Sequence, residues 1–225
     1  MTSLKAKALT SFLKKLVIVS LLIFVSAWSL AFWEAWVFLV VFFIPQLLMI
    51  IYFSRTDPDL LERRLKGRLF AENRTRQKII MSLISLFFVF TVFVSGLDHR
   101  LNWSHVPTFL VVAADVAVVL GFIIQFDTFK QNSFASAVVE IAAKQEVIST
   151  GSYAVVRHPM YAGALVVDFF LPIALGSWWG VLFVLVILVL IILRLFDEEK
   201  LLVLSLPGYE AYCQRVKYRL IPNFW

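Results

Sequence analysis

The stretch Gly151-Ser-Tyr-Ala-Val-Val-Arg-His-Pro-Met-Tyr161 separates a polar segment from a long hydrophobic run. The residue before a proline favours extended geometry, and Pro159 suits the first turn of a helix, where its missing N–H has no partner to lose. Gly151 adds a flexible turn upstream. The stretch therefore predicts a loop that presents four side chains at the start of a helix: Tyr153, Arg157, His158 and Tyr161.

The hydrophobic run 160–196 is too long for one membrane span, because about 20 apolar residues are enough to cross the hydrocarbon core. Gly176-Ser-Trp-Trp-Gly180 interrupts this run near its centre. We therefore predict two short helices, 160–175 and 180–196, joined by a tight turn. Such a hairpin returns the chain to the side of the membrane on which the loop lies.

The composition excludes a soluble domain, because 61% of the 225 residues are hydrophobic, only 16% are charged and the mean hydropathy is +0.87. The net charge of +6 does not indicate nucleic-acid binding, since the basic residues flank apolar runs instead of forming a patch interleaved with aromatic residues. The single Cys213 excludes an internal disulfide and suits a reducing compartment.

Hydrophobic runs before the hairpin predict further membrane helices, and with the hairpin they make an all-α polytopic bundle of about six spans. We predict a turn at Trp33-Glu34, a polar turn at 98–105 and a kink at Pro45. The predicted spans before the hairpin are 16–32, 35–53, 79–97 and 106–126.

Two polar segments lie between these spans. Asp57-Pro58-Asp59 predicts the start of a short amphipathic helix in 54–78, which either lies on the membrane surface or belongs to a solvated loop. The segment 127–150 is predicted to be a loop with a helical piece at 135–144.

The basic residues support this topology. Six spans place 20 of the 21 lysines and arginines on the side that holds both termini and the loop at 151–161, and leave only Arg100 on the other. The positive-inside rule makes the first side cytosolic. A five-span arrangement would separate Arg157-His158 from Glu198-Glu199, so that they could not share a site.

Three short motifs follow the hairpin: Asp197-Glu198-Glu199, Pro207-Gly208-Tyr209-Glu210-Ala211-Tyr212 and Val216-Lys-Tyr-Arg-Leu-Ile-Pro222. Taken alone, Arg157 is equally a positive-inside anchor, and the acidic triplet is better explained as a charged exit from the membrane. Together with Arg-His-Pro-Met-Tyr, the motifs resemble in order and spacing the isoprenylcysteine carboxyl methyltransferase family, relatives of the membrane phospholipid N-methyltransferases. The resemblance covers roughly the last third of the chain, and its tail looks like the bacterial branch.

The resemblance implies one integral membrane domain over residues 1–225, with spans in 1–126 and a cofactor-binding, catalytic part in 127–225. It also implies S-adenosylmethionine as the methyl donor. A carboxylate at Glu198 or Glu199 suits the donor's ammonium, and His158 or the N–H groups after Pro159 suit its carboxylate. Tyrosine ring faces suit the sulfonium. The cofactor residues implied are Val147, Ile148, Tyr153, His158, Pro159, Met160, Tyr161 and Glu198.

Arg194 lies four residues before Glu198, so both lie on one helical face. In the family an arginine at this spacing handles the acceptor, and here it would bind an acceptor carboxylate through a bidentate pair. Arg194 and Glu198 are therefore the predicted catalytic pair. An ionised carboxylate needs no general base, so we expect positioning and exclusion of water to dominate, with no catalytic triad. No metal is expected, because His99, His105 and His158 are scattered.

Several functions stay open. The first is methylation of a prenylcysteine-like carboxylate or another lipid-like acid, with membrane lipids as the surroundings. The second is a phospholipid amine N-methyltransferase, which Arg194 disfavours. The third is a sterol-reductase-like NADPH enzyme, although no added basic cluster for a 2′-phosphate is present. The last is a channel or transporter, for which only Asp115 and Asp168 interrupt the spans; each is a functional candidate or a hydrogen-bonded residue between helices.

Overall fold

The computed structural model describes residues 2–66, 75–135 and 146–225, and every regular element within them is a helix. The all-α prediction is therefore confirmed. The membrane-length helices are α1 (Thr2–Ala27), α2 (Trp33–Thr56), α4 (Thr75–Leu101), α5 (Thr108–Gln131) and α7 (Trp179–Ser205). The shorter ones are α3 (Pro58–Lys66), the 3-10 turn η1 (Gly151–Ala154), α6 (Pro159–Ala174) and α8 (Tyr209–Arg215).

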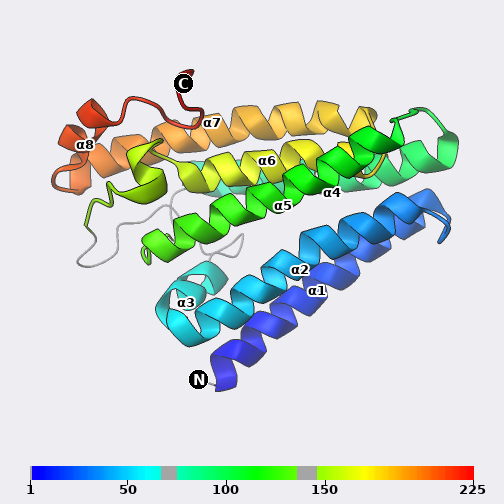
Figure 1. The fold of residues 1–225 in the computed structure, drawn as a ribbon, viewed down its shortest axis with the longest axis horizontal. Helices are drawn as coiled ribbons and strands as arrows, with labels where there is room; N and C mark the ends of the chain where they lie inside the picture. The colour runs from blue at the N-terminus through cyan, green and yellow to red at the C-terminus, as the bar shows by residue number, and fades with distance from the viewer. Residues whose placement is uncertain (1, 67–74, 136–145) are drawn as a thin grey trace.

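The long helices run antiparallel to their neighbours along the chain and form two groups (Figure 1). Helix α6 packs on α5, and α7 packs on α4, while the hairpin of α1 and α2 packs on α4 and α5. The hairpin diverges from α5 toward the end where α3 lies (Figure 1). The elements α3, η1 and α8 all lie at this same end of the bundle, so polar segments far apart in the sequence are brought together there.

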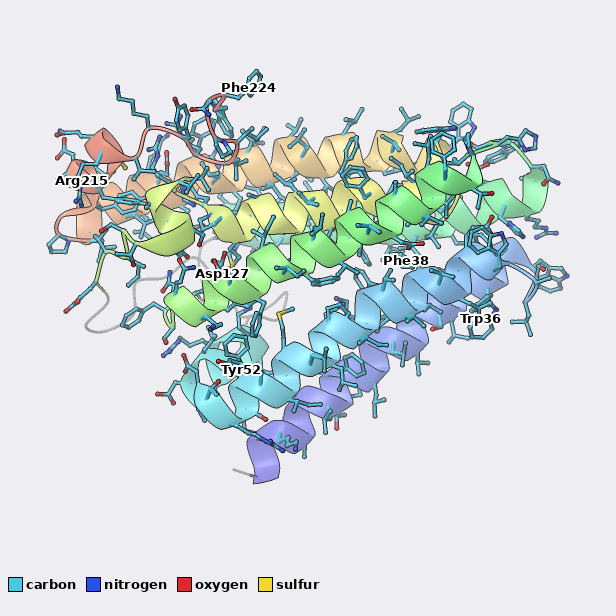
Figure 2. All side chains as sticks on the ribbon, viewed as in Figure 1. Trp36, Phe38, Tyr52, Asp127, Arg215 and Phe224 are labelled. Atoms are coloured by element: carbon cyan, nitrogen blue, oxygen red, sulfur yellow. The ribbon has the colours of Figure 1, made fainter. Side chains whose placement is uncertain are left out.

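Apolar packing between the two groups holds the bundle together. Phe38 is fully buried and points from α2 toward α5, whereas Trp36 lies on the outside, at the end opposite Asp127 and Arg215 (Figure 2). Phe42 of α2 meets Phe122 of α5 edge-to-face, with ring centroids 5.5 Å apart. The outer faces of the long helices expose leucine, isoleucine and valine, as expected of surfaces that face lipid.

The C-terminal hairpin is confirmed, with a turn at Gly176, whose φ of +69° is readily adopted by glycine. The predicted end of its second helix at 196 is wrong. Helix α7 continues to Ser205, so its 27 residues span about 40 Å, more than the roughly 30 Å of hydrocarbon. The helix continues because Asp197 and Glu199 are buried against polar partners of the protein and do not mark an exit into solvent.

Two predicted turns are also misplaced. Trp33 and Glu34 begin α2, and the first turn lies at 28–32, where Phe32 is fully buried. Helix α4 runs on to Leu101 because Asp98 is buried there and accepts hydrogen bonds from the backbone N–H and hydroxyl of Ser104 and from the hydroxyl of Ser177. The first helix also begins earlier than predicted: α1 starts at Thr2, whereas the predicted span was 16–32.

The short helix after Asp57 is confirmed, and the Asp57 carboxylate caps it by accepting a hydrogen bond of 2.9 Å from the N–H of Leu60. Its apolar side chains Leu60 and Leu61 are buried in the protein, so α3 packs on the bundle. The helical piece predicted at 135–144 falls mostly outside the described residues. Asp115 is buried on α5, and neither of its carboxylate oxygens has a hydrogen-bond partner among the described residues.

The arrangement predicts that His105 and Thr150, both exposed, lie on opposite sides of the membrane. We expect a single cysteine at position 150, in a chain whose Cys213 is replaced by serine, to react with an impermeant maleimide from the cytosolic side only. A cysteine at position 105 is expected to react from the other side only. Labelling of both cysteines from one side would contradict the crossing of the membrane by α5.

Candidate active site

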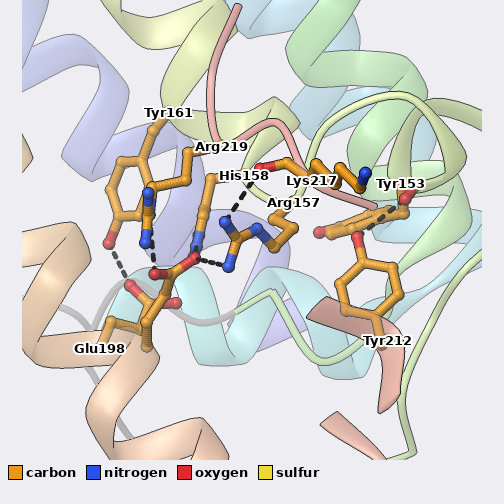
Figure 3. Close-up of polar contacts among 9 residues, drawn as sticks. Tyr153, Arg157, His158, Tyr161, Glu198, Tyr212, Lys217 and Arg219 are labelled. Carbon is orange, nitrogen blue, oxygen red and sulfur yellow. Dashed lines mark hydrogen bonds and ion pairs between the residues drawn. The ribbon is translucent and has the colours of Figure 1, made fainter. Parts of the chain in front are cut away.

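The loop before α6 and the C-terminal tail lie side by side and are joined by backbone hydrogen bonds. The N–H of Arg157 donates to the carbonyl of Tyr218, and the N–H of His158 donates to that of Arg219, both at 2.9 Å. A guanidinium nitrogen of Arg157 also donates to the carbonyl of Lys217 at 3.1 Å (Figure 3). The tail therefore fixes the direction in which the loop presents its side chains.

Glu199 joins these two segments to α7. Its buried carboxylate accepts Arg157 at 2.9 Å and Arg219 at 2.9 Å, and its oxygen that meets Arg157 lies 3.2 Å from Nε2 of His158. The Arg219 guanidinium also lies over the rings of Phe196 and Trp225. We call Glu199 with Arg157, His158 and Arg219 the glutamate clamp. Charge-assisted hydrogen bonds of this kind are stronger than neutral ones.

A second polar chain lies on the neighbouring face of α7. The hydroxyl of Tyr161 donates to Oε2 of Glu198 and accepts a hydrogen bond of 3.0 Å from Nε of Arg194 (Figure 3 shows Tyr161 and Glu198). Another guanidinium nitrogen of Arg194 donates to Oε1 of Gln77 at 3.1 Å, and the Gln77 amide donates to Asp197. Gln77 is fully buried and comes from α4, so three helices orient Arg194.

Tyrosines from η1 and α8 form the opposite wall. The Tyr153 hydroxyl accepts a hydrogen bond from the Asn132 amide at 2.8 Å, and the Tyr212 hydroxyl donates to the Tyr153 carbonyl at 2.7 Å. Burial raises the pKa of Tyr153 to about 12, so it is a neutral phenol at neutral pH. Burial also raises the pKa of Tyr209, whose hydroxyl is buried without a hydrogen-bond partner among the described residues.

These walls enclose a cleft of about 810 Å³, counting the open solvent at its entrance. Every predicted cofactor and acceptor residue lines the cleft except Pro159, which is the first residue of α6. The predicted residues that line the cleft are Val147, Ile148, Tyr153, His158, Met160, Tyr161, Arg194 and Glu198.

The two adjacent glutamates, Glu198 and Glu199, lie in different surroundings. Glu198 lines the cleft, whereas Glu199 lies outside it, in the clamp. The sequence interpretation missed Gln77 and Asp197 as partners in the Arg194 chain, and it missed Asn132 and Leu202 as wall residues. The Gly-Tyr-Glu-Ala-Tyr motif was the only signal for Tyr209 and Tyr212, and it did not say where those rings lie.

The residues of the cleft fit S-adenosylmethionine. Glu198 lines the cleft and would suit an ammonium, and the aromatic rings of Tyr153 and Tyr161, which also line it, would suit a sulfonium. The buried hydroxyl of Tyr209 borders the cleft and is available to a polar ligand group. Apolar Leu202 and Leu206 cover a further part of the wall.

A bundle of long apolar helices with a polar cleft at one end defines a polytopic membrane protein with an enzyme-like site. Residues 109–205 match the phospholipid methyltransferase family (PEMT), which belongs to the isoprenylcysteine carboxyl methyltransferase superfamily of membrane methyltransferases. The resemblance seen in the sequence is thereby confirmed. The match begins in α5 and includes the loop, α6 and all of α7. No curated protein sequence matches the chain.

The clamp predicts that Glu199 contributes more to the free energy of unfolding than an exposed glutamate does. Replacing Glu199 by alanine removes the carboxylate that pairs with the partly buried Arg157 and Arg219, and we expect a loss of about 3 kcal/mol in the free energy of unfolding. Thermal unfolding in detergent, followed by tryptophan fluorescence, measures this change. Glu210→Ala, at an exposed glutamate of α8, is the control. Equal unfolding temperatures for the two variants would show that the clamp does not stabilise the fold.

Proposed function

We propose that this protein transfers a methyl group from S-adenosylmethionine to the carboxylate of a prenylcysteine-like or other lipid-like acceptor. The family match supports a membrane methyltransferase, and methyltransferases of this family typically use S-adenosylmethionine. The observation that carries the finer proposal is the hydrogen-bonded chain Glu198–Tyr161–Arg194. It provides an acidic group for the donor and a basic group for the acceptor within one cleft.

On the donor side, Glu198 binds the ammonium and is held in place by the Tyr161 hydroxyl. The first N–H groups of α6, those of Met160 and Tyr161, have no intrahelical acceptor and suit the donor's carboxylate. His158 lies beside them, with its ring nitrogen engaged by Glu199. The glutamate clamp therefore acts on the donor side by positioning His158.

On the acceptor side, Arg194 is oriented by its bonds to Tyr161 and Gln77 and binds the carboxylate through its guanidinium group. S-adenosylmethionine, when bound, supplies a methyl group activated by its sulfonium, which an ionised oxygen can displace without any proton transfer. The protein therefore has to align the two groups and exclude water. Arg194 is buried on α7, and the apolar part of the same helix faces lipid. The acceptor's tail can therefore lie in the bilayer while its head reaches the cleft.

Methylation of a phospholipid amine is the second candidate, and the family match is equally compatible with it. An ammonium must lose a proton before it can accept a methyl group, and Glu198 and Glu146 are carboxylates of the cleft that could receive one. The two candidates differ in what Arg194 binds: the reacting carboxylate in the first, the phosphate in the second. In both, we place the cleft and the termini on the cytosolic side, as the distribution of basic residues suggests.

The donor assignment predicts that S-adenosylhomocysteine binds the purified protein and that Glu198→Gln weakens this binding. Loss of a charge-assisted hydrogen bond corresponds to about 1.5–3 kcal/mol. Calorimetry in detergent measures the affinity, with Glu210→Gln as the control and NADPH as the competing cofactor. Unchanged affinity in Glu198→Gln would remove Glu198 from the site, and binding of NADPH alone would favour a reductase.

The acceptor assignment predicts that Arg194→Lys loses turnover although it keeps its charge. Lysine cannot bridge Tyr161 and Gln77 and also present a planar pair of donors, so we expect kcat/KM to fall about tenfold or more. The affinity for S-adenosylhomocysteine should change little. The measurement is methyl transfer to a farnesylated thiol acid, with the exposed Arg215→Lys as the control. Full turnover in Arg194→Lys, or a parallel loss of cofactor binding, would contradict the acceptor role.

A further inference from the structure

A second hollow of the surface, which we call the tail groove, lies between the end of α7 and the C-terminal tail. The tail runs back along the outer side of α7 (Figure 1), and the ring of Trp225 meets that of Phe196 edge-to-face, with centroids 5.8 Å apart. None of the residues that line the tail groove lines the cleft, so the two are separate surfaces. The tail groove is lined by Phe196, Glu199, Lys200, Val203, Leu204 and Arg219.

The tail groove lies at the depth of the lipid head groups. Trp178 and Trp179 are exposed at the start of α7, as expected of aromatic residues at a membrane interface. Lys200 lies about 32 Å further along the axis of the same helix, and the hydrocarbon core of a bilayer is about 30 Å thick. An α7 that crosses this core therefore places Lys200 at the opposite interface, level with the lipid phosphates.

Apolar side chains of the tail groove are left uncovered by the protein. Leu204 is 84% exposed, and Phe196 and Val203 are also exposed. In the neighbouring tail, Phe224 is exposed and points away from the bundle (Figure 2). Apolar surface at a membrane interface is stabilised when acyl chains cover it. The surroundings of the tail groove therefore favour a lipid.

The tail groove also carries positive charge that the protein does not neutralise. Within the described parts of the chain, the Lys200 ammonium has no hydrogen-bond or ion-pair partner. Arg219 donates to Glu199 through Nε alone, and its two terminal nitrogens have no hydrogen-bond partner among the same residues. The Glu199 carboxylate also pairs with Arg157, so that one negative charge meets two positive ones. The tail groove is therefore complementary to an anion.

We propose that the tail groove binds an anionic phospholipid of the surrounding membrane. The lipid phosphate lies between Lys200 and the open edge of the Arg219 guanidinium, whose planar fork matches it, and the acyl chains cover Phe196 and Leu204. An anionic head group is favoured over a zwitterionic one, because the cationic part of the latter would be repelled by the surplus positive charge. Since Arg219 also binds Glu199, the bound lipid holds the tail against the glutamate clamp. This site does not depend on methyl transfer.

The test is lipid binding by the delipidated protein, measured by native mass spectrometry with dioleoylphosphatidylglycerol or dioleoylphosphatidylcholine. We expect the parent protein to bind one phosphatidylglycerol more tightly than phosphatidylcholine. Lys200→Gln should raise the dissociation constant for phosphatidylglycerol about fivefold and leave that for phosphatidylcholine unchanged. Leu204→Ser should weaken both lipids, because it removes apolar contact. Lys130→Gln, at an exposed lysine in the last turn of α5, is the matched control and should change neither affinity.

Two further measurements distinguish this site from other modes of binding. Arg194→Lys, a change inside the cleft, should leave phosphatidylglycerol bound, and glycerol 3-phosphate, which has no acyl chains, should not displace the lipid at equal concentration. The proposal is overturned by equal affinities for the two lipids, by equal effects of Lys200→Gln and Lys130→Gln, by loss of the lipid in Arg194→Lys or by displacement with glycerol 3-phosphate. A parent protein that binds no lipid and forms a dimer would assign the tail groove to a second copy of the chain, which also overturns it.

Discussion

The carboxylate of Glu199 is the interaction on which the arrangement of the site depends. It receives Arg157 and His158 from the loop before α6 and Arg219 from the C-terminal tail, so one buried negative charge holds three separate segments together. Backbone hydrogen bonds between loop and tail act in the same direction. Because the loop ends at the first residue of α6, this clamp also sets the direction in which His158 and Tyr161 face.

The neighbouring Glu198 faces a different part of the protein from Glu199, although both lie on α7. Successive residues of an α-helix point about 100° apart, so Glu198 faces the cleft while Glu199 faces the clamp. Arg194, four residues earlier, returns to the face of Glu198, and Tyr161 bridges the two. The two adjacent acids therefore differ in position: Glu199 lies in the clamp and Glu198 lines the cleft.

Much of the architecture could be predicted because membrane helices leave strong signals in a sequence. The interrupted run 160–196 indicated a hairpin, and the structure contains it. The errors fell where polar residues stand at helix ends: Asp98 and Asp197 read as exits from the membrane, yet both lie inside helices. A sequence does not reveal that Ser104 and Ser177 donate hydrogen bonds to Asp98, or that Gln77 donates one to Asp197, because these partners come from other segments.

The sequence by itself determined the class of the protein, the number of apolar segments and eight of the 17 residues that line the cleft, because hydropathy, proline position and short motifs are local properties. Only the tertiary structure decided which side chains meet. It placed Glu198 in the cleft and Glu199 in the clamp, joined Gln77 to Arg194 and brought Arg64 to Met160. Those contacts join residues up to 117 positions apart, and they exist because antiparallel helices return distant polar ends to one side of the bundle.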